Sequence, residues 1–283
     1  MTDFRQAFAS VMGDSNMMWP PMDNKSKETI RHRGIIATIV LLTFISSCSK
    51  KGETEDLAKA QACLDNVAEG SPSQADACMD YVEQYSDQQA NILKCAIKMT
   101  SGGLNENKIV KAYNALKDST QTNKTAAFMA VLSLDYPTVT AGYTKAVAAD
   151  VFCQASGVPG LMYISGVILA GTYMNKTVFD LSGGVSGINV NDPAAINTAI
   201  TNMLTQCTSA TPPASCTSDL PTLGTTVIGL SGSYCANPSA DQNVCGQINN
   251  AVTNAGGSSA AVGQALFCYL SNKTYNATTG LCQ

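Results

Sequence analysis

The sequence of 283 residues contains one His, one Trp and three Arg, and all of them lie within the first 33 residues (His32, Trp19, Arg5, Arg31 and Arg33). From residue 34 onward the chain therefore has no imidazole and no guanidinium group. This absence excludes Ser-His-Asp and Cys-His catalysis, His-ligated zinc and bidentate arginine clamps from that part of the chain. Phosphate-loop, C-x-x-C and EF-hand patterns are also missing, so we expect no enzymatic activity, no metal and no cofactor.

Charge is scarce as well. Charged residues make up 13% of the chain, about half of the usual quarter, and the formal net charge is −4. A weakly acidic chain has no basic patch with which to hold a phosphate backbone, so we expect no nucleic-acid partner. The 45% of hydrophobic residues is enough to build the core of one large domain or two small ones.

The chain has one uninterrupted hydrophobic run before residue 50, GIIATIVLLTFI at residues 34–45. A spanning helix needs about 18 or more apolar residues, so this run is too short. Basic side chains precede it (Lys25, Lys27, Arg31, His32 and Arg33). A basic flank followed by about twelve apolar residues is typical of a secretory signal.

Directly after the run stands Ile45-Ser46-Ser47-Cys48, an aliphatic residue, two small ones and a cysteine. This order resembles the lipobox of bacterial lipoproteins. The resemblance implies that the Cys48 thiol is acylated with diacylglycerol, that residues 1–47 are removed, and that the new N-terminus is acylated too. A signal beginning at Met22 would have conventional length, so we expect residues 1–21 to be either an upstream extension from a misassigned start or a disordered segment. Ser49 replaces the Asp that retains enteric lipoproteins at the inner membrane, which implies the outer membrane, on its periplasmic or surface side.

Ten cysteines follow Cys48, and an even number in an exported chain predicts five disulfides. Cys63 and Cys78 lie nearly equidistant from the turn at residues 70–73, so antiparallel helices would bring them level. The same argument around Gly256-Gly257 favours Cys245–Cys268. Elimination then leaves Cys95–Cys153, Cys207–Cys216 and Cys235–Cys282. A rival scheme of local bridges, Cys235–Cys245 with Cys268–Cys282, stays open.

Apolar residues recur at helical spacing through most of the chain, so we expect an all-α fold of helical hairpins, packed as a bundle or a solenoid-like array and stapled by disulfides. Residues 48–56 are expected to form a lipidated polar tether, residues 57–181 a helical-hairpin half, and residues 182–283 a low-charge, cysteine-dense half that continues the same domain. Expected helix starts include Ser73, a capping box at Ser86 with Gln89, and Asn105. The apolar stripe expected on the helix after Asn105 is Ile109, Ala112, Tyr113 and Leu116.

Residues 158–174 form the most apolar stretch after Cys48. We interpret this stretch as a central buried helix; the alternative, a membrane span, would place disulfide-forming cysteines on both sides of a membrane. The glycine-rich segment 181–187 lacks the spacing of a phosphate loop and is interpreted as a linker.

Two groups of side chains could form sites. Asp76, Asp80, Glu83 and Asp87 fall at helical intervals, where paired carboxylates could act as acid and base; a solvated helix face is the simpler interpretation. Tyrosines 113, 136, 143, 163 and 173, with Met129, Met162 and Met174, could line an apolar cavity or simply form core.

These observations together predict a membrane-anchored, non-enzymatic lipoprotein that binds an envelope protein or a small apolar ligand. The alternative is a structural or adhesive cell-surface protein, which the uncharged second half favours.

Overall fold

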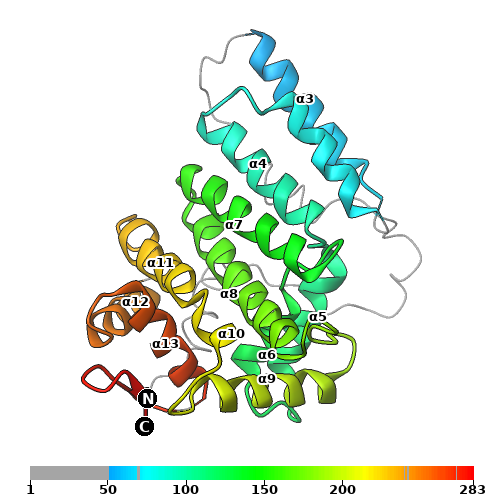
Figure 1. Cartoon of the computed structure of the whole chain (residues 1–283). Coiled ribbons are helices and arrows are strands. Elements are labelled where there is room, and N and C mark those ends of the chain that lie inside the picture. Colours follow the sequence, from blue (N-terminus) through cyan, green and yellow to red (C-terminus); the bar gives the residue numbers. More distant parts are fainter. Residues whose placement is uncertain (1–50, 69–70, 239, 241, 272) are drawn as a thin grey trace, which may run out of the picture.

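The computed structural model describes residues 51–68, 71–238, 240, 242–271 and 273–283. These residues form eleven α-helices with almost no strand, so the predicted all-α fold is confirmed (Figure 1). The elements are α3 (Lys51–Asp65), the 3-10 helix η3 (Pro72–Tyr81), α4 (Gln88–Ser101), α5 (Glu106–Lys117), α6 (Lys124–Val131), α7 (Val139–Ala155), α8 (Pro159–Leu181), α9 (Pro193–Cys207), α10 (Ala214–Thr217), α11 (Leu220–Gly229), the π-helix η4 (Leu230–Tyr234), α12 (Gln242–Asn254), α13 (Ser259–Leu270), β1 (Tyr275–Asn276) and β2 (Leu281–Cys282). In the part of the chain that is described, no helix is long and apolar enough to cross a membrane.

The N-terminal end of the described chain differs from expectation. Helix α3 begins at Lys51, so residues 51–56 of the segment expected to be a polar tether are helical. Glu53 in its first turn favours the helix through the helix dipole, and Lys59 pairs with Glu55 one turn earlier at 2.9 Å. The next segment is a 3-10 helix that starts at Pro72, so the predicted cap at Ser73 is wrong.

Helix starts follow short polar side chains. Asp87, not Ser86, caps α4, because its carboxylate accepts hydrogen bonds from the backbone N–H groups of Gln89 and Ala90. The predicted cap at Asn105 is confirmed, with its side chain accepting from the N–H of Lys108.

The helices α3, η3, α4, α7 and α8 follow one another in space, each contacting the next (Figure 1). Helix α8 is the centre of the fold and also contacts α6, α9 and α11. Fourteen of its residues are buried, which confirms the prediction of a central buried helix. Gly171 allows α6 to approach closely, because a side chain there would overlap the carbonyl oxygen of Met129.

Buried apolar side chains form two clusters. The smaller one lies among α3, η3 and α4 and includes Leu57, Val82, Leu93 and Ile97. The larger one extends from Cys95 to Leu270, so it draws residues from both sides of position 182.

The apolar stripe predicted for α5 is partly wrong. Ala112 is buried, but Tyr113 and Ile109 expose 53% and 42% of their surface. Helix α5 packs against α6, and its buried residues are the small Ala112 and Ala115, so the larger side chains of the predicted stripe are not the ones that α5 buries.

All ten described cysteines form disulfides. Three predicted pairs are confirmed, Cys63–Cys78, Cys95–Cys153 and Cys207–Cys216, with Cα–Cα distances of 5.6, 5.1 and 5.2 Å. The predicted Cys245–Cys268 and Cys235–Cys282 pairs are wrong, because the structure contains the rival bridges Cys235–Cys245 and Cys268–Cys282.

The physical reason lies in how α12 and α13 pack. They are joined through Gly256-Gly257 as expected, but α13 lies mainly against α11 rather than along α12. Cys245 therefore meets Cys235 at the end of η4, while Cys268 meets the C-terminal hairpin, in which Tyr275 pairs with Cys282.

Candidate functional site

A groove of about 470 Å³ is lined by residues of α7 and of the α11–η4 segment. Its lining residues are Asp150, Gln154, Thr225, Thr226, Gly229, Gly232 and Ser233. This volume is within the range of small-molecule sites, about 300–1,000 Å³. Most of the lining surface is carbon, and one carboxylate stands among hydroxyl and amide groups.

Asp150 is the only ionisable residue in this lining. Its Oδ1 accepts hydrogen bonds from Ser165 Oγ of α8 at 2.6 Å and from Gln154 Nε2 at 3.3 Å. Burial raises the pKa of Asp150, and these two hydrogen bonds offset only part of that effect. Among the described residues no lysine forms an ion pair with it.

The opposite wall is formed where α11 changes into a π-helix. In η4 the chain follows i→i+5 hydrogen bonding, an arrangement that often occurs at functional sites. Ser233 of η4 donates to Gln154 Oε1 at 2.6 Å and so connects the two walls. Gly229 and Gly232 have open space where a side chain would stand, because no heavy atom lies within 4 Å of an added Cβ.

The four carboxylates that the sequence placed at helical intervals do not form a common site, and each has a different environment. Asp76 Oδ2 accepts from Lys145 at 2.9 Å, and Oδ1 accepts from Lys98 at 3.2 Å. Burial alone would raise the pKa of Asp76, but hydrogen bonds from Lys145, Ser101 and Lys98 outweigh it and lower the pKa. Asp87 caps α4, and Asp80 and Glu83 are exposed. Asp76 and Asp87 therefore hold local structure, whereas Asp80 and Glu83 are exposed, as expected for a solvated helix face.

Most of the tyrosines and methionines that could have lined a cavity belong to the main core. Tyr163, Tyr173, Met129, Met162 and Met174 are all buried there. Tyr173 stacks on Phe267 with ring centroids 5.9 Å apart. Tyr136 and Tyr143 are partly exposed, and Tyr113 lies on the outer surface of α5. None of these eight side chains lines the groove at Asp150.

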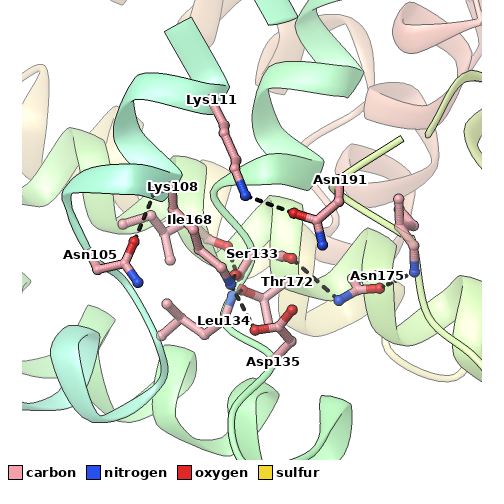
Figure 2. A network of polar contacts seen from close by, with 11 residues as sticks. Asn105, Lys108, Lys111, Ser133, Leu134, Asp135, Ile168, Thr172, Asn175 and Asn191 are labelled. Atoms are coloured by element: carbon pink, nitrogen blue, oxygen red, sulfur yellow. Dashed lines mark hydrogen bonds and ion pairs between the residues drawn. The ribbon is translucent and has the colours of Figure 1, made fainter. Parts of the chain in front are cut away.

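Figure 2 shows a second polar cluster, where α5, α8 and the turn between α6 and α7 meet. Lys108 Nζ donates to the carbonyl of Ser133 at 2.6 Å and to Asp135 Oδ1 at 2.7 Å (Figure 2). Asn175 donates to Ser133 Oγ and accepts from the N–H of Ile188 at 2.7 Å. These groups are paired with one another, so the cluster holds the α6–α7 turn and the 187–191 segment in place.

Two further predictions concern segment 181–187 and Cys48, and only the first of them falls within the described residues. The glycine-rich segment 181–187 is a surface turn in which Ser182 Oγ accepts from the N–H groups of Val185 and Ser186. Cys48, the predicted lipidation residue, lies outside the described residues.

Within the described ranges no three His, Cys, Asp or Glu side chains gather closely enough to hold a metal ion.

The sequence patterns did not predict the groove at Asp150. The available signals were weak: a lone acidic residue near the end of an apolar helix, and the small residues Gly229, Ser231, Gly232 and Ser233 around Leu230. Neither signal indicates that these segments meet, because 75 residues separate Asp150 from Thr225.

No protein-family model, no curated protein and no solved structure matches this chain.

Proposed function

We propose that this protein is a bacterial lipoprotein, anchored through Cys48, that acts as a non-enzymatic binding protein at the cell envelope. The observation that carries the proposal is the distribution of its eleven cysteines. Ten are paired in five disulfides, which is typical of an exported protein, and the eleventh is the cysteine of the lipobox-like sequence.

The position of α3 fits this anchoring. Its first residue, Lys51, follows Cys48 by three positions, so the helical body would lie close to the bilayer. Acyl chains give about 0.8 kcal/mol of membrane affinity per buried CH₂, so the three chains of a mature lipoprotein would hold it firmly. No transmembrane helix is needed in this arrangement.

The groove at Asp150 supports a binding role over a purely structural one. A structural or adhesive protein needs a stable surface, and the disulfides provide that stability without any groove. Here a partly buried carboxylate lies in an open groove without a lysine partner among the described residues. Such groups cost stability and are typical of sites that receive a ligand.

The anchor is tested by expressing the full chain in a bacterium and determining the N-terminal peptide by mass spectrometry. We expect a mature N-terminus at Cys48 that carries diacylglycerol, and partition of the protein into detergent. Cys48→Ala is expected to abolish both. Ser47→Ala keeps a small residue before the cysteine and is the matched control, which should be processed normally. An unmodified Cys48 in the native chain would contradict the proposal.

A further inference from the structure

We propose that the groove between α7 and η4 binds a small organic cation, a primary alkylammonium whose head is held by Asp150 and whose short aliphatic body lies along α11. The inference deepens the proposed binding role but does not depend on the lipid anchor.

The first argument concerns the charge. The Asp150 carboxylate lies inside the groove, with Oδ1 hydrogen-bonded to Ser165 and Gln154. An anionic group that is partly removed from water gains most from a cationic partner, and a primary ammonium supplies both charge and N–H donors. Among the described residues no lysine forms an ion pair with Asp150, so a cationic ligand can take that role.

The second argument concerns hydrogen-bond polarity. The donors of the lining side chains are already directed at protein acceptors: Thr225 Oγ1 donates to the carbonyl of Pro221 at 2.7 Å, and Thr226 Oγ1 to that of Thr222 at 3.1 Å. Ser233 Oγ donates to Gln154 Oε1 or to the carbonyl of Gly229. Gln154 Nε2 faces Asp150 and the carbonyl of Met162.

The described lining side chains therefore offer oxygen lone pairs to the groove and no spare donor. This arrangement favours a ligand that donates hydrogen bonds and disfavours carboxylates and phosphates, which only accept them.

The third argument concerns shape. Most of the groove surface is apolar, and its lining includes Thr225, Thr226, Gly229 and Gly232. The absence of side chains at these two glycines keeps the groove open. A ligand of this groove therefore needs an apolar body in addition to its charged head.

The test uses the full chain purified in detergent and three probes of similar size: n-butylammonium, n-butanol and butyrate. Isothermal titration calorimetry at neutral pH should detect binding of n-butylammonium. The affinities for n-butanol and butyrate should be lower by about tenfold or more. Equal binding of n-butanol, or no binding of n-butylammonium, would overturn the inference.

Two variants locate the site. Asp150→Asn keeps the shape of the side chain and should weaken n-butylammonium binding about tenfold; Asp65→Asn, an exposed carboxylate on α3, is the matched control. Gly232→Leu should fill the groove and block binding, because no heavy atom lies within 4 Å of a Cβ at this position. Gly246→Leu on α12, where open space also surrounds the glycine, should leave binding unchanged. Full binding by both site variants would refute the assignment.

The binding result and the anchoring result are separable. A correctly acylated protein that does not bind n-butylammonium would refute only this inference. A protein that binds this probe but lacks a lipid on Cys48 would refute only the anchor.

Discussion

Gly224 of α11 and Gly263 of α13 face each other where the two helices cross, and a Cβ on Gly224 would lie 2.9 Å from the backbone nitrogen of Gly263. The same Cβ would overlap the carbonyl oxygen of Ser259, and a Cβ on Gly263 would overlap that of Leu220. Backbone therefore meets backbone at this crossing. The contact positions α11, and with it the π-helix that forms one wall of the groove.

This crossing predicts a strong effect of one methyl group. Gly224→Ala should lower the free energy of unfolding by about 3 kcal/mol, because neither backbone can move aside without separating the helices. Gly246→Ala, on the open face of α12, is the control and should leave stability within about 1 kcal/mol of the native value. Urea unfolding followed by circular dichroism measures both. Equal stability of the two variants would show that the helices do not approach this closely.

The disulfide pairing is open to direct mapping. Digestion without reduction should release peptides that link Cys235 to Cys245 and Cys268 to Cys282. A linked pair of Cys245 and Cys268 would contradict the structure. Replacing both Cys235 and Cys245 with serine should cost about 2–3 kcal/mol, the value expected for a loop of this length.

Asp76 should stabilise the fold in a pH-dependent way. Its pKa is lowered in the folded protein, so its contribution is fully present above the ordinary value of 3.8 and is lost as the pH falls through the lower folded value. Asp76→Asn leaves Lys98 and Lys145 without their carboxylate and should cost about 1–2 kcal/mol at neutral pH, a range reduced for the partial exposure of Asp76.

Asp80→Asn, on the same 3-10 helix, is the control for Asp76 and should change stability little because Asp80 is exposed. Unfolding by urea at neutral pH and in the acid range compares the two variants. The same loss of stability in both variants would show that the Asp76 ion pairs contribute nothing specific.

The contribution of Asp150 to stability should depend on pH in the opposite sense to that of Asp76. Burial raises its folded pKa above 3.8, so the folded state holds the proton more tightly than the unfolded state. Its contribution to stability therefore decreases as the pH rises from 3.8 through the folded value, and is constant outside that interval. The groups that face Asp150 are Ser165 from α8 and Gln154 from α7, and neither carries a charge.

Asp150→Asn should remove that slope from a plot of unfolding free energy against pH, whereas Asp65→Asn should retain it. Over the same interval, the affinity of the native protein for n-butylammonium should increase with pH because the carboxylate becomes ionised. An affinity that stays constant across the interval would contradict ligand contact with Asp150.

The helical architecture could be predicted from local patterns. Apolar spacing, Pro159 and Pro193 at helix starts, and caps such as Asn105 act within a few residues of one another, so the sequence contains their full signal. Short-range sequence patterns gave the wrong residue where two neighbouring side chains could both cap a helix. At α4 the ionised Asp87 takes the cap in place of the neighbouring Ser86.

By itself, the sequence determined the all-α class, the central buried helix, the absence of imidazole and guanidinium chemistry after residue 33, and the lipobox-like order before Cys48. Each depends on composition or short-range spacing. Tertiary structure decided which of two cysteine schemes forms, that Tyr113 faces outward, and that Asp150 shares a groove with Gly232. These outcomes depend on which helices pack together, and small residues such as Gly224 and Gly263 determine that packing through backbone contacts between distant segments.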